Sequence, residues 1–270
     1  MNDTPARVTF DAQTDAFYRS VLQVLNGAGL PVLVGGAYAF AIYTGIQRQT
    51  KDLDLFVRGS DYSRLTDVLG AAGYQTQLTF PHWLGKVYSG SLFVDIIFNS
   101  GNGLTPVEDA WFEHAPDAEV LGIPAKLMPV EEMIASKAFI MERERFDGAD
   151  VAHLLLLFAQ RLDWKRLLGL VGPNWRVLLS HVVLFGFIYP GELARIPAWM
   201  VDELVARLRA ETDVPPGDER LCRGTLLSRE QYLHDIVQEG YVDARLPPYG
   251  TLRPEDLAVW TEAIKDEKRG

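Results

Sequence analysis

The sequence predicts an α+β protein: a mixed sheet flanked by helices, followed by a helical C-terminal domain. Residues 52–57 alternate acidic or aromatic with aliphatic side chains, which is the period of a half-buried strand. Three further strand-like runs, 74–80, 83–88 and 92–98, follow with turn residues between them. From Ala149 onward the apolar residues recur at helical spacing, and several segments are apolar nearly all round, as in a helical bundle.

The other elements follow from caps, breakers and periodicity. Helices are expected at 11–26, from Gly36, at 61–70, from Pro129 to about Arg145, from Ser228 to about Glu239 and from Pro254 to Asp266. Residues 31–34 are expected to form a short strand, and residues 119–128 one extended piece. These elements suggest three parts: an N-terminal α+β domain at 1–128, which holds the candidate site described below, a helical domain at 129–211, and a tail at 212–270 with two short helices.

Composition narrows the class of protein. The chain has 270 residues, 48% of them hydrophobic and 23% charged, as in an ordinary globular protein. Its formal net charge of −10 argues against non-specific binding to nucleic acid or to a membrane surface. One cysteine, Cys222, excludes a disulfide framework. No signal-like start and no apolar run of a membrane span's length are evident, so a cytoplasmic address without membrane contact is expected.

The candidate site is the strand at 52–57. Leu53, Leu55 and Val57 alternate with the other residues, so Asp52 and Asp54 share one face. Two residues of strand advance about 6.8 Å, which lets the two carboxylates share divalent ions. Asp is depleted in strands, and each carboxylate there must be solvated, paired or bound to metal.

A glycine pair precedes this strand. Gly35 and Gly36 follow the short strand that ends at Val34, and they open a helix. A helix start offers backbone N–H groups and a positive dipole end to a phosphate. Alone, such a pair is most often only a turn. Together with the two aspartates, it predicts a phosphate cradle and metal carboxylates within one βαβ-sized unit.

These residues resemble the signature of the DNA polymerase beta-type nucleotidyltransferase superfamily. Gly35-Gly36 is followed after fifteen residues by Asp52-Leu53-Asp54-Leu55, and Arg48-x-Thr50-x-Asp52 is typical of the bacterial branch that includes AbiEii-like abortive-infection toxins. The spacer is slightly longer than usual. Ala37 stands where some members carry a phosphate-binding serine.

The resemblance assigns roles to further residues. Asp95 interrupts an apolar strand, so it lies on an open face or is held by a cation, and it matches the family's third carboxylate. Lys137 interrupts an apolar helical stripe, where it either snorkels or meets an anion. The resemblance makes Lys137 a triphosphate contact in a motif with Arg143 and Asp147-x-x-Asp150, although Phe146 stands where the branch often has arginine.

The resulting hypothesis is a transferase that moves a nucleoside monophosphate from an NTP, such as ATP, to an acceptor hydroxyl. Its metal and catalytic residues are Asp52, Asp54 and Asp95, with two Mg²⁺ ions expected, or Mn²⁺ in their place. Its nucleotide-binding residues are Gly35, Gly36, Arg48, Thr50 and Lys137. The acceptor is a small molecule, a tRNA end or a protein, and not duplex nucleic acid. The branch suggests an antitoxin partner. The alternative is a non-catalytic scaffold or regulatory partner with an idle site.

Overall fold

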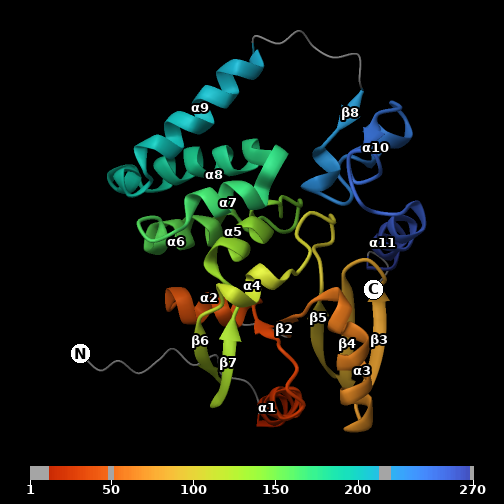
Figure 1. Cartoon of the computed structure of the whole chain (residues 1–270). Helices are drawn as coiled ribbons and strands as arrows, with labels where there is room; N and C mark the ends of the chain where they lie inside the picture. Colours follow the sequence, from red (N-terminus) through yellow and green to blue (C-terminus); the bar gives the residue numbers. More distant parts are fainter. Residues whose placement is uncertain (1–11, 48–51, 213–219, 268–270) are drawn as a thin grey trace. The chain divides into compact units, whose positions relative to one another are not determined.

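The computed structural model describes residues 12–47, 52–212 and 220–267, and the chain forms two compact units, Met1–Pro129 and Val130–Gly270 (Figure 1). Arg48 and Thr50 lie outside the described residues, so their predicted roles stay predictions.

A seven-stranded sheet forms the centre of the first unit. Its strands are β1 (Leu33–Val34), β2 (Leu53–Phe56), β3 (Gln75–Phe80), β4 (Leu84–Ser89), β5 (Leu92–Ile97), β6 (Asp117–Val120) and β7 (Ile123–Leu127). Their order is β3-β4-β5-β2-β1-β7-β6. β2 runs parallel to β5 and β1 to β7, and the other neighbours are antiparallel. The predicted mixed sheet is confirmed.

Helices pack on this sheet (Figure 1). They are α1 (Ala12–Gly27), α2 (Gly36–Thr44), α3 (Tyr62–Ala71), which follows the 3₁₀ turn η1 (Gly59–Asp61), and α4 (Asp109–Glu113). α1 contacts α3, β5 and β7, because its residues Tyr18, Val21 and Leu25 present one fully buried face. Each such side chain contributes roughly 1.5–3 kcal/mol of burial free energy. The β2 residues Leu53 and Leu55 are also fully buried.

The first unit differs from expectation at two places. Residues 119–128 were predicted as one extended piece, but they belong to the hairpin β6–β7, which turns at Leu121 and Gly122 with φ of 54° and 76°. Gly122 is an ordinary turn residue, but leucine is unusual at positive φ, so the pair did not indicate a two-residue hairpin turn. Helix α4 was not predicted. It is only five residues long, and it buries Trp111.

The second unit begins with a bundle of helices. They are α5 (Val130–Ala138), α6 (Gly148–Phe158), α7 (Trp164–Val171), the 3₁₀ turn η2 (Gly172–Asn174), α8 (Trp175–Ile188), the 3₁₀ helix η3 (Pro190–Arg195) and α9 (Ala198–Thr212). The prediction that the first helix runs to about Arg145 was wrong, because it ends at Ala138. The chain then reverses through residues 139–147, which brings Asp147 back to Lys137.

The C-terminal segment of the second unit is also folded. It contains β8 (Leu221–Cys222), the 3₁₀ turn η4 (Gly224–Leu226), α10 (Leu233–Val237), β9 (Val242–Asp243) and α11 (Pro254–Glu267). The start of α11 at Pro254 is confirmed. The helix expected from Ser228 starts only at Leu233, because Ser228 caps a preceding turn by accepting from the Gln231 N–H at 3.1 Å.

Residues Trp164–Ile188 are long and apolar enough for a membrane span, contrary to the expectation from the sequence. The stretch is not one helix, because η2 with Pro173 separates α7 from α8. α8 packs on α5, α6, α7 and α9 and buries Leu178, His181 and Phe185. These contacts are those of a bundle helix.

Candidate active site

The parallel pairing of β2 with β5 brings together carboxylates that are far apart in sequence. Asp54 of β2 lies directly opposite Asp95 of β5 in the ladder. In a parallel pair, opposite residues point to the same face of the sheet. The two carboxylates therefore lie side by side on one face, and Asp52 joins them two residues earlier in the chain.

The three aspartates form a cluster with the geometry of a metal site. One carboxylate oxygen from each of Asp52, Asp54 and Asp95 lies within 4.8 Å of the others. Carboxylates at this spacing repel one another, unless a cation is bound among them or some are protonated. Carboxylate oxygens are the ligands that Mg²⁺ prefers. The donor set therefore fits a divalent ion, as the sequence predicted.

Helix α2 begins beside this cluster. The Gly35 N–H donates to the Asp54 carbonyl oxygen at 3.0 Å, and Gly36 follows at φ 54°. A Cβ at Gly36 would lie 1.7 Å from Asp54 Oδ2, so only glycine fits between the helix start and the carboxylate. No side chain caps α2 at Gly35, and Ala39 donates to the Gly35 carbonyl. The glycine pair opens a helix as expected.

The electrostatics of α2 also reflect the nearby aspartates. Burial raises the pKa of the Tyr38 phenol in the first turn of α2, and the charges of Tyr18, Asp15 and Asp52 add to the shift. The phenol is therefore kept in its neutral form.

Asp95 is the most buried member of the cluster, with 9% of its surface exposed. Burial raises its pKa, the charge of Asp52 adds to this, and the hydrogen bond from Lys86 opposes it. Lys86 Nζ lies 2.7 Å from Asp95 Oδ1 and 3.8 Å from the centre of the Phe93 ring. One oxygen of the third carboxylate is thus already hydrogen-bonded within the protein.

Lys86 is the site residue that the sequence reasoning missed. The sequence does contain a signal for Lys86, in the turn between the strands predicted at 83–88 and 92–98. A two-residue turn at Gly90-Ser91 sets Ser89 opposite Leu92, and counting back along both strands sets Lys86 opposite Asp95. Hairpin register alone would have paired this cation with this carboxylate.

Lys137 lies in the second unit, within a separate cluster of charges. Its Nζ is 3.0 Å from Asp147 Oδ2 and 2.7 Å from Asp150 Oδ2. Arg145 also binds Asp147 through two hydrogen bonds of 3.0 Å. Burial alone would raise the pKa of Asp147, but Arg145 and Lys137 together lower it. The sequence left a snorkelling or an anion-bound lysine open, and these contacts favour the second.

A hollow of about 500 Å³ lies elsewhere in the first unit, lined by Arg58–Ser60 and Val107–Ala110. Its one lining arginine, Arg58, is ion-paired with Asp61 and Asp109, each at 2.6 Å. The cation is therefore already neutralised. The cluster of three aspartates does not line this hollow.

The family model for uncharacterised nucleotidyltransferases matches residues 10–173 of the chain. The chain belongs to this nucleotidyltransferase family. The match includes the glycine pair, the three aspartates and Lys137. It ends before α8, so the C-terminal segment lies outside it. No curated protein matches the sequence.

Several solved structures resemble the nucleotidyltransferase at low identity. Crystalline ANT(2")-Ia with adenylyl-2"-tobramycin is 15% identical, with a TM-score of 0.40 over 74% of this chain and 99% of that one. The lincomycin-bound lincosamide adenylyltransferase LnuA is 14% identical, with a TM-score of 0.38 over 53% of this chain and 96% of that one. JHP933 from Helicobacter pylori is 11% identical, with a TM-score of 0.35 over 76% of this chain and 97% of that one. At these scores, the similarity identifies neither substrate nor acceptor.

Proposed function

We propose that this nucleotidyltransferase moves a nucleoside monophosphate from an NTP to an acceptor hydroxyl, with the help of divalent metal. The observation that carries the proposal is the convergence of Asp52, Asp54 and Asp95 beside the glycine start of α2. In a chain of this family, that convergence supplies the cation site and the phosphate-binding backbone that such a transfer needs.

In this proposal, Asp52, Asp54 and Asp95 hold two Mg²⁺ ions, or Mn²⁺ in their place. Bound ions of this kind neutralise the triphosphate and lower the pKa of the acceptor hydroxyl. Gly35 and Gly36 let the phosphates approach the backbone at the start of α2. Arg48, Thr50 and Lys137 add nucleotide contacts. These three contacts are predictions from motif resemblance.

The step that these residues serve is a substitution at phosphorus. The acceptor oxygen forms a bond to the α-phosphorus of the NTP, and the bond from that phosphorus to the bridging oxygen breaks. Pyrophosphate leaves with the electron pair, and Asp95 receives the proton of the acceptor hydroxyl. Such reactions depend mainly on positioning and charge stabilisation, so no further nucleophile from the protein is required.

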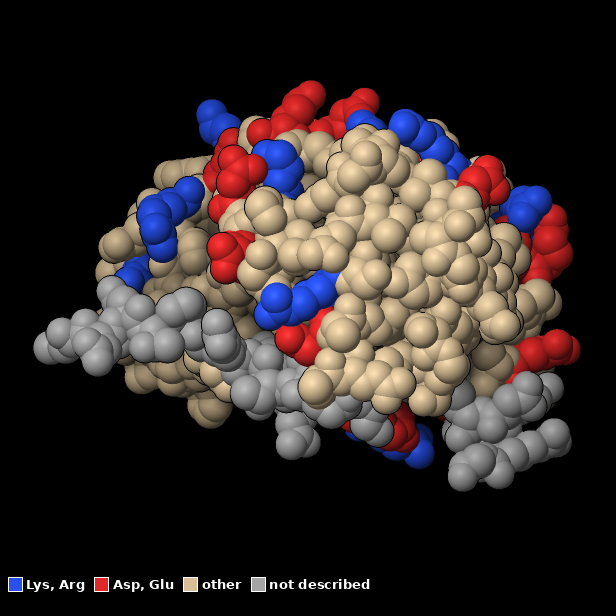
Figure 2. Space-filling view, turned by 90° about the horizontal axis from the view of Figure 1, so that it is seen from below, with Lys and Arg blue, Asp and Glu red and all other residues tan. Residues whose placement is uncertain are grey.

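The acceptor in this proposal is a small molecule, a tRNA end or a protein hydroxyl, and not a length of duplex. Binding duplex requires a basic track that neutralises many phosphates. The chain carries a net charge of −10. On the face shown in Figure 2, Lys and Arg side chains of the described residues alternate with Asp and Glu around a broad area of other residues, without a continuous basic track.

Nucleotide binding tests the metal site directly. We expect NTP affinity, measured by calorimetry, to fall sharply when Mg²⁺ is replaced by a chelator. Asp95→Asn should retain NTP binding but lose turnover, because a group on the acceptor side matters more for the transition state than for the ground state. Equal affinity with and without metal would refute the metal site.

Transfer of label from NTP to one of several acceptor pools identifies the class of acceptor. The protein is incubated with Mg²⁺ and with total tRNA, cell protein or small hydroxylated metabolites that include aminoglycosides, and in a separate arm with duplex nucleic acid. Label on one of these pools identifies the acceptor class, whereas label on duplex alone contradicts the proposal. Label in none of them favours the rival function, a non-catalytic scaffold or regulatory partner.

Four finer expectations belong to this proposal. The Arg48-x-Thr50-x-Asp52 run supports membership of the AbiEii-like branch, and with it an antitoxin partner. Cytoplasmic residence without membrane contact is the expectation that the net charge of −10 and the division of Trp164–Ile188 by η2 support. Co-purification with the product of a neighbouring gene, and fractionation of the tagged protein, test these expectations.

A further inference from the structure

Residues 139–147 of the second unit form a tight loop that carries part of the motif around Lys137. Met141 and Phe146 pair as an isolated antiparallel bridge, and the Glu142 N–H donates to the Arg145 carbonyl oxygen at 2.8 Å. Arg143 and Glu144 therefore sit at the exposed tip of a small hairpin. At its base, the Asp147 N–H donates to the Ile140 carbonyl oxygen at 3.1 Å.

The C-terminal segment, residues 220–267, contacts this hairpin through backbone groups. The Met141 N–H donates to the Leu227 carbonyl oxygen at 3.1 Å. The Gln231 side-chain amide donates to the Met141 carbonyl oxygen, also at 3.1 Å. Both backbone groups of Met141 are thus bound by a segment more than 80 residues further along the chain.

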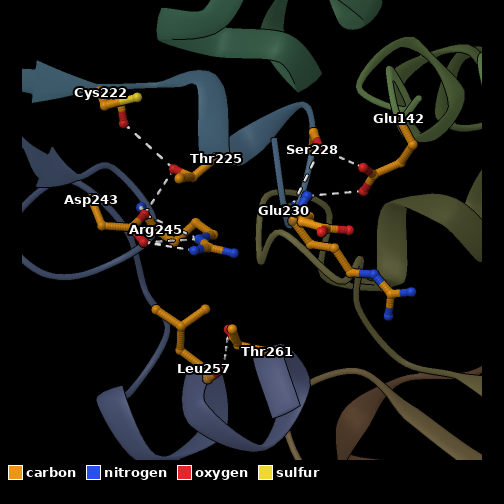
Figure 3. A network of polar contacts seen from close by, with 10 residues as sticks. Glu142, Cys222, Thr225, Ser228, Glu230, Asp243, Arg245, Leu257 and Thr261 are labelled. Carbon is orange, nitrogen blue, oxygen red and sulfur yellow. Dashed lines mark hydrogen bonds and ion pairs between the residues drawn. The ribbon is translucent and has the colours of Figure 1, made fainter. Parts of the chain in front are cut away.

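Glu142 makes the charged part of the same contact (Figure 3). Its carboxylate accepts from the Ser228 hydroxyl and, at 2.9 Å, from the Arg229 N–H. Ser228 is 1% exposed, and its oxygen also accepts from the N–H groups of Glu230 and Gln231 at 3.3 and 3.1 Å. Two backbone N–H groups already occupy the lone pairs of the Ser228 oxygen, so any further hydrogen bond of this hydroxyl must be one that it donates. Its partner must therefore be an acceptor, and the Glu142 carboxylate is one.

The C-terminal segment is itself held by a buried ion pair (Figure 3). Arg245 is 1% exposed and donates to Asp243 through Nε and Nη2, with Nη2 2.7 Å from Oδ2. Asp243 also accepts from the Thr225 hydroxyl at 2.8 Å. The guanidinium lies 5.7 Å from the centre of the Trp260 ring of α11. The segment therefore has a fixed internal structure from which Ser228 projects.

We propose that the C-terminal segment acts as a clamp on the 139–147 hairpin, and that Glu142 is the positioning residue through which it acts. The clamp holds Arg143 and the backbone beside Lys137 in one conformation before nucleotide binds, which lowers the entropic cost of binding an anion. The effect on nucleotide binding rests on the proposed function. The clamp itself does not.

Trypsin tests the clamp because it cleaves after Arg143 and Arg145. We expect Glu142→Gln and Ser228→Ala in the full-length chain to raise the cleavage rate at these bonds, followed by mass spectrometry, by about tenfold. The amide introduced by Glu142→Gln would set a donor against a hydroxyl that already accepts two N–H groups. Amide exchange at Met141 should rise in parallel. Each cleavage rate is divided by that of a short peptide with the same substitution, because Glu142 and Glu144 both flank Arg143. Glu144→Gln, at the exposed tip of the same hairpin, is the matched control and should change neither this ratio nor the exchange rate.

The double variant Glu142→Gln/Ser228→Ala separates the clamp from general loss of folding. If both residues act through one shared contact, the cleavage rate of the double variant rises by less than the product of the two single effects. The clamp would be overturned if the two single-variant effects multiplied fully in the double variant. It would also be overturned if the variants were cleaved and exchanged at the rates of the unchanged chain. Circular dichroism and thermal melting confirm that each variant is folded.

Nucleotide kinetics test the positioning role. We expect Glu142→Gln to raise the KM for NTP by about three- to tenfold with kcat within twofold, because the loss falls on binding. Faster cleavage with an unchanged KM would overturn the positioning role. If the unchanged chain transfers no nucleotide to any acceptor, the proposed function fails, and the cleavage and exchange rates still decide whether the clamp exists.

Discussion

The two charged clusters of this protein are built in opposite ways. In the first unit, Asp52, Asp54 and Asp95 place like charges within 4.8 Å of one another. In the second, Lys137 lies between Asp147 and Asp150. Opposite charges in contact stabilise one another, whereas converging carboxylates cost stability until a cation arrives. The comparison shows that similar residues form a candidate ligand site in one unit and an internal ion-pair network in the other.

The largest effect is expected at the converging cluster. Asp54→Asn should lower turnover by about a thousandfold, or ~4 kcal/mol, because it removes a charge required in the transition state. It should leave the melting temperature unchanged or raised, since it relieves repulsion between carboxylates. Steady-state rates and thermal melting are compared with those of Asp67→Asn, an exposed control on α3. A large fall in melting temperature would make Asp54 a structural residue.

Removing a charge from the ion-pair network should lower the stability of the protein instead of preserving or raising it. Lys137→Met leaves two buried carboxylates without their shared ammonium, so unfolding in urea should show a loss of about 3 kcal/mol. Lys126→Met removes an exposed pair with Asp117 and should cost less than about 1 kcal/mol. If Lys137 also binds triphosphate, NTP affinity falls by a further ~1–3 kcal/mol. A stable variant with undiminished affinity would contradict both roles.

Two glycine variants separate the effect of the close contact between Gly36 and Asp54 from the effect of backbone strain. Gly36→Ala forces a Cβ into the space of the Asp54 carboxylate and also strains a positive φ, whereas Gly45→Ala, at φ 72° with open space around it, only strains the backbone. Gly45→Ala should lose about 1–2 kcal/mol of stability from backbone strain, and Gly36→Ala should lose more, because the clash with Asp54 adds to that strain. Only Gly36→Ala should weaken Mn²⁺ binding, measured by titration. Equal effects of the two variants on Mn²⁺ would contradict the contact.

The smallest effect is expected at the contact of Lys86 with Asp95. There the first cluster, like the second, contains an ion pair between a lysine and an aspartate. Lys86→Met removes a cation from Asp95 while keeping an apolar chain over Phe93. We expect Mn²⁺ to bind about fivefold more tightly, since a positive charge leaves the carboxylate cluster, while turnover falls because Asp95 is no longer oriented. Lys126→Met again serves as control. Unchanged Mn²⁺ affinity would place Asp95 outside the metal site.

The sequence alone predicted that Asp52, Asp54 and the start of α2 belong to one candidate site. Strand period put Asp52 and Asp54 on one face, and the glycine pair fixed the start of a helix, because both signals are local. The existence and approximate bounds of strands β1 to β5 along the chain followed in the same way. His181 falls in an apolar helical run, and it is accordingly buried, with its Nε2 2.9 Å from the Ala138 carbonyl oxygen.

The tertiary structure decided which charges meet. The pairing of Asp54 with Asp95 depends on β2 lying parallel to a strand some 40 residues later, and the contact of Lys86 with Asp95 depends on hairpin register. The predicted helix through Arg145 failed because ion pairs with Asp147 and Asp150 accompany a chain reversal after Ala138. Glu142 meets Ser228 across 86 residues. Local propensity cannot encode such contacts, because each side chain gains its partner only when the whole unit folds.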